Sequence, residues 1–378
     1  MLDNRKVPAP GQHMAFRETD FAEIPGWSED DQRGALKAFL RSCRKGGWKG
    51  GKTSPVASAE VRQGLAAACA EAARRGLSER STLVEARQFF ESAFRAYHVD
   101  TAKPDGFLTG YYEPELEGSL TRSEAYRVPI LKRPDDLVDL VDRSLHASAN
   151  DRLAAGRSEG GKVVPYFTRQ EIEDGALDGR GLTLLYLKDP VDAFFMHVQG
   201  SGRIRLADGQ VVRIGYAGKN GHPYTSIGGV LVSRGIFSRE EMSLATLRGW
   251  LDAHPKEGRE LMQLNRSYIF FQMYGPARDG EGPVGASGVA LTEGRSLAVD
   301  ASYHVLGTPI YAMSPTLGVA GRSGLNRLMI AQDVGSAIKG PERGDIFWGS
   351  GKAAEALAGE TKHPGSFIVL LPRGVTVP

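Results

Sequence analysis

The chain has 378 residues, of which 41% are hydrophobic and 24% are charged, and its formal net charge is +2. This length and composition exclude intrinsic disorder and leave room for two domains. So small a net charge argues against nucleic acid or an anionic membrane as the main partner. No window is apolar for long enough to span a bilayer, and the first residues lack the apolar core of a secretory signal. We therefore expect either a cytosolic protein or one whose targeting segment is absent from this chain.

Three helices are predicted in the first hundred residues. Apolar residues recur at helical spacing over 36–43 and again over 61–69. The third helix starts at a capping box formed by Thr82 and Glu85, and an apolar stripe follows over 86–97.

Cys43 and Cys69 are the only two cysteines, and each lies on the apolar face of a predicted helix. A helix pair could bring them within bridging distance. A disulfide would contribute roughly 3 to 4 kcal/mol in the chain-entropy model and would imply an oxidising compartment. Two buried free thiols are an equally good interpretation of the sequence.

From residue 106 the pattern changes to short apolar or alternating runs between Gly and Pro, which predicts strands. A polar stretch over 146–162, a short helix after the capping box of Thr168 and Glu171, and a helical patch over 238–264 interrupt them. The last third predicts a compact barrel or sandwich. The predicted strands are 107–112, 126–131, 182–187, 193–198, 211–216, 268–273, 296–299, 308–312, 328–331, 345–348 and 367–371.

Two motif matches lack the context that their chemistry needs. The stretch 46–53 fits the G-x-x-x-x-G-K-T phosphate loop, but a predicted helix precedes it and Pro55 follows. The stretch 336–339 fits S-x-x-K without the partner elements of penicillin-binding enzymes. The histidines are scattered without metal-ligand spacing, so no metal site is predicted.

Asp333 is the candidate catalytic residue. It ends an apolar run inside a turn framed by glycines, where partial loss of solvent raises the pKa of a carboxyl group towards the range useful for proton transfer. Asp300 ends another apolar run, and Asp345 opens a third. The alternative is that Asp333 only ties down its turn through its own side chain.

Three segments have the composition of a sugar-binding surface. The stretches 107–114, 196–202 and 216–224 carry aromatic rings, amides, hydroxyls and bare glycine backbone. Sugar rings pack on aromatic faces, and their hydroxyls bond to amides and backbone groups. Each segment taken alone could equally be a structural turn.

Four blocks of the chain resemble the membrane-bound lytic transglycosylase A family of bacterial cell-wall enzymes. The resemblance covers about 106–372 and implies a mainly β fold with N-terminal helices. A double-psi β-barrel domain would comprise 1–112 and 215–378, and a smaller β-rich domain of 113–214 would be inserted into it, with a groove between them. The blocks are 108–114, 198–202, 216–222 with 226–228, and 331–340 with Asp345 and Gly349.

The resemblance implies a lytic transglycosylase that cleaves the β-1,4 bond between N-acetylmuramic acid and N-acetylglucosamine and leaves 1,6-anhydromuramic ends. Asp333 would act alone as general acid and then as base, with no cofactor and no metal. Asp300, Lys339 and Asp345 would support it. Substrate contacts are expected from Thr109, Tyr111, Gln199, Tyr216, Lys219 and Asn220.

The same resemblance implies a periplasmic protein, with outer-membrane attachment through a segment absent from this chain, and it favours a bridge between Cys43 and Cys69. We expect a monomer that binds peptidoglycan glycan strands and no nucleic acid. Two alternatives stay open. One is a hydrolase in which a second acid such as Asp345 activates water, and the other is a wall-binding module without turnover.

Overall fold

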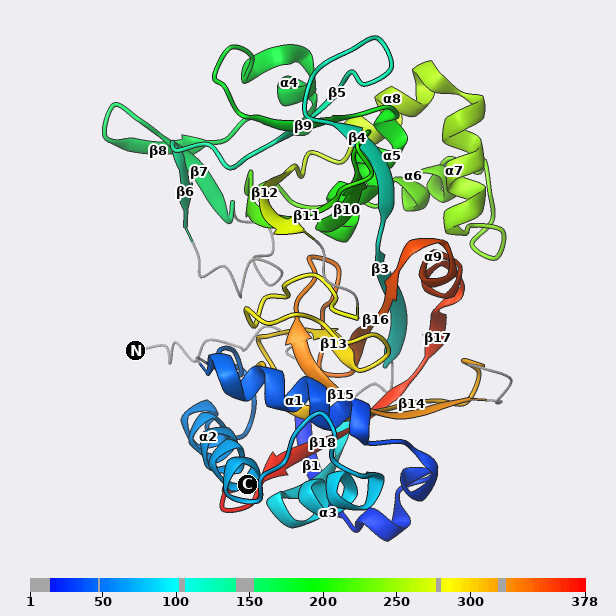
Figure 1. Ribbon diagram of the computed structural model, residues 1–378. Coiled ribbons are helices and arrows are strands. Elements are labelled where there is room, and N and C mark those ends of the chain that lie inside the picture. The colour runs from blue at the N-terminus through cyan, green and yellow to red at the C-terminus, as the bar shows by residue number, and fades with distance from the viewer. Residues whose placement is uncertain (1–13, 47, 102–105, 141–152, 277–279, 319–323) are drawn as a thin grey trace, which may run out of the picture.

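The computed structural model describes residues 14–46, 48–101, 106–140, 153–276, 280–318 and 324–378. Among these residues, nine strands form one mixed sheet, shown in the lower half of Figure 1. β13 and β15 run parallel, as do β16 and β3, and the other pairs are antiparallel. In sheet order the strands are β1 (Met14–Thr19), β2 (Phe94–Thr101), β18 (Ser366–Pro372), β14 (Pro309–Ser314), β15 (Leu325–Asp333), β13 (Ser296–Val299), β16 (Arg343–Ser350), β3 (Phe107–Glu113) and β17 (Lys362–Pro364).

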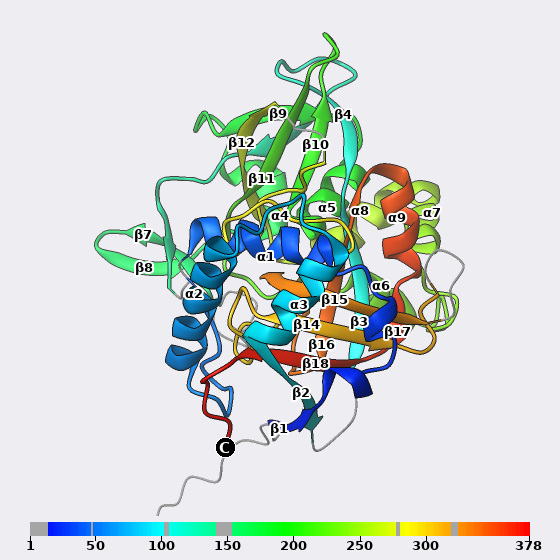
Figure 2. The same cartoon turned by 60° about the horizontal axis from the view of Figure 1, so that its bottom comes forward.

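Three helices cover this sheet: α1 (Arg33–Lys45), α2 (Ser58–Arg74) and α3 (Leu83–Ala93). Figure 2 shows them lying across the strands. Their apolar faces join the sheet in one core, in which Phe90 packs edge to face against both Phe39 and Phe89. Two 3₁₀ turns (Phe21–Glu23 and Trp27–Glu29) precede α1, and α9 (Gly351–Glu360) follows β16.

The predicted capping box of Thr82 and Glu85 starts α3, as expected. The helix ends at Ala93, however, because Phe94 is extended and begins β2. The prediction that the helix continues to residue 97 was therefore wrong. Tyr97 is still buried, but it is buried through pairing with β1 and β18.

A disulfide joins Cys43 on α1 to Cys69 on α2, with the two Cα atoms 5.5 Å apart. The bridge closes a separation of 26 residues and fixes the two helices to each other. Of the two interpretations that the sequence left open, the bridge is the one present.

Six further described strands form a second sheet in the upper half of Figure 1. Their order is β12 (Ile269–Pro276), β11 (Val211–Lys219), β10 (Ser201–Arg205), β4 (Glu115–Ser119), β9 (Thr183–Leu187) and β5 (Val128–Leu131). Beside this sheet lies a smaller one of β6 (Leu137–Asp139), β7 (Ala155–Glu159) and β8 (Lys162–Pro165). The helices packed here are α4 (Arg169–Glu171) with the π-helical turn Ile172–Ala176, α5 (Pro190–Gln199), α6 (Ile227–Ser233), α7 (Leu244–Ala253) and α8 (Pro255–Gln263).

The second sheet extends further along the chain than the expected span of 113–214. β11 pairs with β12, and only after β12 does the chain return to the first sheet. The strands of the second sheet therefore lie between Glu115 and Pro276. This pairing could not be predicted from local patterns, because α6, α7 and α8 separate the two strands along the chain.

Two other predictions of local structure were wrong. The apolar run 193–198, predicted as a strand, lies in α5, which starts with Pro190 after the N-cap Asp189. Its apolar residues face the second sheet on one side and α6 to α8 on the other. The polar stretch 146–162 contains β7, which forms a hairpin with β8 at the end of the stretch, whereas 146–152 lies outside the described residues.

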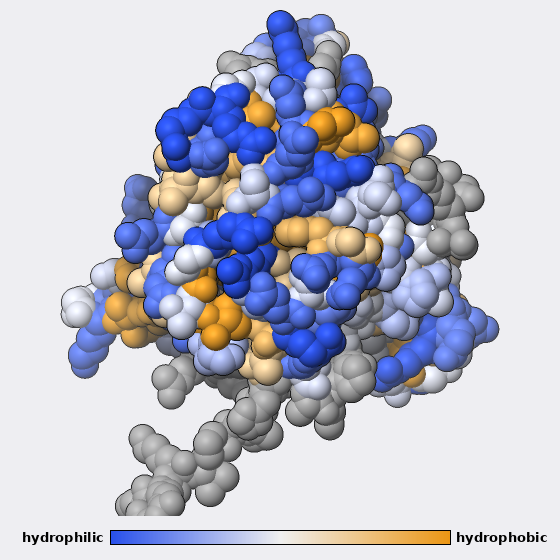
Figure 3. Space-filling model, turned by 90° about the horizontal axis from the view of Figure 1, so that it is seen from below, coloured by the Kyte–Doolittle hydropathy of each residue, from blue (hydrophilic) through white to orange (hydrophobic). Residues whose placement is uncertain are grey.

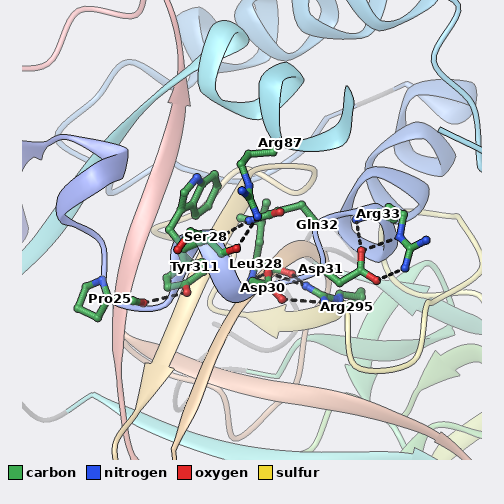
Figure 4. A network of polar contacts seen from close by, with 11 residues as sticks. Pro25, Ser28, Asp30, Asp31, Gln32, Arg33, Arg87, Arg295, Tyr311 and Leu328 are labelled. Carbon is green, nitrogen blue, oxygen red and sulfur yellow. Dashed lines mark hydrogen bonds and ion pairs between the residues drawn. The ribbon is translucent and has the colours of Figure 1, made fainter. Parts of the chain in front are cut away.

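A polar network anchors the segment before α1 to the first sheet (Figure 4). The carboxylate of Asp30 accepts two hydrogen bonds from the guanidinium of Arg295, at 2.8 and 2.9 Å. It also accepts the backbone N–H of Leu328, which lies on β15, at 2.9 Å. The Tyr311 hydroxyl on β14 donates to the carbonyl of Pro25 at 3.0 Å. The strand that carries Asp333 is thus held in register from its other end.

A buried carboxylate, Glu113, joins the two sheets where β3 ends. It accepts hydrogen bonds from Arg213 (2.7 and 3.1 Å), from Arg203 (3.0 Å) and from the Ser350 hydroxyl (2.8 Å). Arg203 and Arg213 lie on β10 and β11, whereas Ser350 ends β16. Both arginines also donate to the carbonyl of Glu281 in the segment that leaves the insert.

The surface at the end that carries α3 is mostly hydrophilic, and its apolar residues form separate patches (Figure 3). None of the described helices is both long and apolar enough to cross a membrane.

Candidate active site

Strand register brings two of the three acids into one row. Asp333 on β15 pairs with Ala298 on β13, Ala298 pairs with Asp345 on β16, and Asp345 pairs with Thr109 on β3. Neighbouring strands are about 4.8 Å apart, so the backbones at Asp333 and Asp345 lie about 10 Å apart. Asp300 follows two residues after Ala298, just beyond the end of β13.

Asp333 is partly buried and accepts two well-formed hydrogen bonds. The Tyr111 hydroxyl donates to Oδ2 at 2.8 Å, and the backbone N–H of Ala286 donates to Oδ1 at 2.9 Å. These bonds favour the charged carboxylate, whereas burial favours the neutral acid. Burial is the larger effect, so the pKa of Asp333 is raised above its ordinary value.

The loop that supplies the Ala286 N–H approaches Asp333 closely because residue 285 is glycine. A Cβ atom on Gly285 would lie 2.7 Å from the carbonyl oxygen of Gln332 and 3.4 Å from Cγ of Asp333. The N–H of Ser287 donates to the same carbonyl at 3.0 Å. The buried amide of Gln332 in turn donates to the carbonyl of Ala38 on α1 at 2.8 Å. Both the loop and α1 therefore hold the end of β15.

Asp345 has a different environment. Its Oδ1 accepts from the Thr109 hydroxyl at 2.6 Å, and Arg343 donates to the same hydroxyl oxygen at 2.9 Å. Burial raises the pKa of Asp345 to about 6, and the charge of Asp333 raises it too, while Thr109 and Arg343 act in the other direction. A carboxyl group in this state is partly protonated below neutral pH.

Asp300 is buried and binds backbone amides. Its carboxylate accepts the N–H of Ser302 and the N–H of Gly340, both at 3.0 Å. Gly340 ends the turn that follows Asp333, so Asp300 holds that turn closed. Lys339 in the same turn is attracted to Asp300.

The carboxyl group of Asp333 faces a cleft of about 310 Å³ between the two sheets. The cleft is lined by four of the six residues for which a substrate contact is expected, namely Tyr111, Gln199, Tyr216 and Lys219. Among the described lining residues, Asp333 is the only carboxylate. Val198 and Gln199 also line a neighbouring cavity of about 650 Å³, which includes Thr109. The two cavities make a groove that passes Gln199.

Asn220 is fully buried and does not line the cleft. Its amide nitrogen donates to the carbonyls of Phe167 and Arg266, both at 2.8 Å, and its oxygen accepts the N–H of Tyr268 at 2.9 Å. Asn220 thus holds loops of the insert together. It is a framework residue and leaves no polar atom turned towards a ligand.

Several lining groups were not singled out individually in the sequence. Lys49, Tyr274 and Ser336 line the cleft, and so does the backbone of 283–286. His197, another lining residue, accepts from buried Arg169 at 3.0 Å through Nδ1, because a guanidinium can only donate. These groups come from segments far apart in the sequence. Aromatic and amide composition could have pointed to Tyr274 alone.

Neither of the two motifs has the structural context that its chemistry needs. α1 ends before the stretch 46–53, and α2 starts only at Ser58, so no helix begins at its Lys-Thr pair. Ser336 and Lys339 lie in the turn after Asp333. Among the described residues, no three or more His, Cys, Asp or Glu side chains are arranged to hold a metal ion.

Two family models match the chain in the regions that build this cleft. The MltA specific insert domain matches residues 107–272, and the 3D domain matches 295–371. Membrane-bound lytic murein transglycosylase A of Escherichia coli K12 is 36% identical over 291 residues, which are 75% of this chain and 70% of that protein. The chain belongs to the membrane-bound lytic murein transglycosylase A (MltA) family. Its fold is the MltA fold, a double-psi β-barrel with an insert domain.

Other members of the MltA family show the same relationship. The Vibrio cholerae protein is 42% identical over 204 residues, which are 52% of this chain and 54% of that relative, so this match spans about half of the relative's length. The crystal structure of a membrane-bound lytic murein transglycosylase from Agrobacterium tumefaciens has a TM-score of 0.82 and 38% identity, covering 95% of this chain and 98% of that one. E. coli MltA with bound chitohexaose has a TM-score of 0.67 and 29% identity, covering 96% of each chain.

Proposed function

We propose that this protein is a lytic transglycosylase that cleaves the β-1,4 bond between N-acetylmuramic acid and N-acetylglucosamine in peptidoglycan. One observation carries the proposal: the cleft contains a single described carboxylate, Asp333, whose pKa is raised by burial. A single acid suffices only if no water has to be activated by a second one. The relatives' names as lytic murein transglycosylases support this reaction.

In the first step, protonated Asp333 donates its proton to the oxygen of the scissile bond as the bond between C1 and that oxygen breaks. In the second step, the Asp333 carboxylate takes the proton of the muramoyl C6 hydroxyl while that oxygen attacks C1. The product is a 1,6-anhydromuramic end, and Asp333 is protonated again. The nucleophile belongs to the same sugar, which gives the entropic advantage of an intramolecular reaction.

The surroundings of Asp333 suit both halves of this cycle. Burial raises the pKa of the acid and so favours its neutral form before the reaction, while the Tyr111 hydroxyl and the Ala286 N–H stabilise the carboxylate formed in the first step. We assign Tyr111, Gln199, Tyr216 and Lys219 to contacts with the glycan. Thr109 would meet it in the neighbouring cavity.

Three residues have supporting roles in this proposal. Asp300 holds the turn after Asp333 through backbone amides, and Lys339 lies close to Asp300. Asp345 lies in the same row of strands as Asp333, whose charge helps to raise the pKa of Asp345. Asn220, first expected to contact substrate, would only support the wall of the insert.

A hydrolase on the same fold would need a second carboxylate to activate water. Asp345 is the nearest candidate, yet it bonds to Thr109 and is not among the described lining residues of the cleft. This arrangement favours the transglycosylase over the hydrolase.

The proposed partner is a glycan strand of peptidoglycan, supported by the chitohexaose bound in the E. coli structure. We place the protein in the periplasm, because its disulfide suits an oxidising compartment. Attachment to the outer membrane, a monomeric state, and the absence of any cofactor or nucleic-acid partner belong to the same proposal.

The test is mass spectrometry of fragments released from purified sacculi. The proposal expects anhydromuramic ends, which are lighter by one water than the reducing ends that a hydrolase releases. Reducing ends would identify a hydrolase. If neither the parent protein nor Asp333→Asn releases fragments while both bind sacculi, the protein is a wall-binding module.

A further inference from the structure

The proton transfer proposed for Asp333 makes no use of Lys219. Lys219 ends β11 in the insert, is only 5% exposed, and lines the cleft. Its Nζ donates to the hydroxyl of Ser336 at 3.1 Å. Ser336 is exposed in the turn that follows Asp333. The ammonium group of Lys219, which lies in the insert, therefore bonds to the turn that follows Asp333 in the first sheet.

A second cation lies behind this pair. Lys339 is in the same turn as Ser336, and among the described residues its buried Nζ has no hydrogen-bond partner. Its charge repels that of Lys219. Burial and this repulsion lower the pKa of Lys219 to about 8, so Lys219 is still mostly charged at neutral pH.

The ammonium group of Lys219 has an uncharged hydrogen-bond partner, the Ser336 hydroxyl. Among the described residues that line the cleft, the one carboxylate is Asp333, and the proposed reaction needs Asp333 to be neutral when substrate binds. A buried ammonium without an anionic partner is unfavourable, and an anionic ligand would remove much of that cost. The Ser336 hydroxyl accepts from Lys219 and still has its own hydrogen to donate. The two groups together could thus bind a carboxylate.

We propose that Lys219 and Ser336 bind a carboxylate of the muramic acid residue, with Lys339 as a second positive charge, so that the cleft selects acidic over neutral glycans. This inference rests on the proposed function, which supplies a glycan in the cleft. The carboxylate has two sources: the free lactyl group of a peptide-free strand, or the stem peptide of a substituted one.

Calorimetric binding in an Asp333→Asn background tests the proposal without turnover. The ligands are neutral chitohexaose, a peptide-free tetrasaccharide of alternating N-acetylglucosamine and N-acetylmuramic acid, its lactyl methyl ester, and the peptide-bearing tetrasaccharide. The ester has nearly the size of the acid but no charge. Lys256→Met, an exposed position on α8, is the matched control for removing one positive charge.

Lys219→Met should weaken binding of the carboxylate ligand about tenfold, the size expected from one hydrogen bond between charged groups. Binding of chitohexaose and of the ester should change by no more than about twofold. Lys219→Arg should restore part of the difference, since it keeps the charge. Ser336→Ala changes an exposed residue and leaves the core intact. It should also weaken binding of the carboxylate ligands, but by less than Lys219→Met does.

The source of the carboxylate is identified by the ligand whose binding is weakened in the Lys219 and Ser336 variants. A loss confined to the free acid assigns the lactyl carboxylate, and a loss confined to the peptide-bearing sugar assigns the stem peptide. Equal losses for acid and ester, or no loss for either acidic ligand, would overturn the inference. The product assay on sacculi is independent of it, so anhydro ends from a protein with no carboxylate preference would leave the proposed function standing.

Discussion

Glu113 and Asp333 are two carboxylates with little solvent contact, at the ends of strands in the same sheet, and their hydrogen-bond donors differ in charge. Glu113 has the positive charges of Arg203 and Arg213 within hydrogen-bond distance. Asp333 accepts from neutral donors, the Tyr111 hydroxyl and the backbone N–H of Ala286. The two guanidinium groups make Glu113 a structural link between the sheets, whereas burial raises the pKa of Asp333. The charge of the neighbouring donors therefore distinguishes the two sites, and burial alone does not.

The largest expected effect is on activity, from Asp333→Asn. The amide cannot donate and reclaim a proton, so release of anhydro products should fall by about 10³-fold or more, within the usual range for general acid and base catalysis acting in two steps. The free energy of unfolding should change by less than about 1 kcal/mol, since no charge pair is broken. Product release from sacculi and a denaturant melt measure the two effects. A variant that retains turnover would remove Asp333 from the chemistry.

Glu113→Gln should show the reverse pattern. It leaves the buried guanidinium of Arg213 without its carboxylate and removes one of the two carboxylates beside Arg203, so the protein should lose about 3 to 5 kcal/mol of stability. The activity of the fraction that stays folded should fall much less than in Asp333→Asn. Denaturant melts and rates per folded molecule separate the two effects. If stability is unchanged, the contrast between the two acids fails.

Asp345 is an intermediate case, because it has a hydroxyl partner and only a more distant charge from Arg343. Its folded pKa of about 6 lies above the unfolded value of about 3.8, so the folded state binds more protons between these pH values. Stability from this group is therefore greatest below pH 4 and is lost as pH rises to about 6, by roughly 2 to 3 kcal/mol. Asp345→Asn should remove this decline. Melts at several pH values on both proteins measure it, and identical slopes would contradict the assignment.

The smallest effect is expected from Tyr111→Phe, which removes one neutral donor from Asp333. The lost bond stabilised the carboxylate, so the pKa of Asp333 should rise further and the alkaline limb of the activity profile should move to higher pH. The maximal rate should fall about tenfold, because the carboxylate formed in the first step loses a hydrogen bond. The pH dependence of product release measures both. A limb that moves to lower pH would show that Tyr111 does not donate to this acid.

Local signals in the sequence determined much of the molecule. The capping box at Thr82 fixed the start of α3, and alternating apolar runs marked most strands of the first sheet. Part of the candidate site could be predicted from the sequence for the same reason. An acid at the end of an apolar run within a glycine-framed turn pointed to Asp333, and the segments rich in aromatics and amides contained Tyr111, Gln199 and Tyr216, all of which line the cleft.

Only tertiary structure decided what depends on distant partners. The run 193–198 is helical because both of its faces are covered, and periodicity cannot distinguish such a helix from a buried strand. Strand register set the row of Asp333 and Asp345, and pairing of β11 with β12 set the end of the insert. The cations that distinguish Glu113 from Asp333 come from β10 and β11, about a hundred residues away from Glu113. A sequence shows which groups can ionise, but the neighbours that shift the pKa of each group come together only when the chain folds.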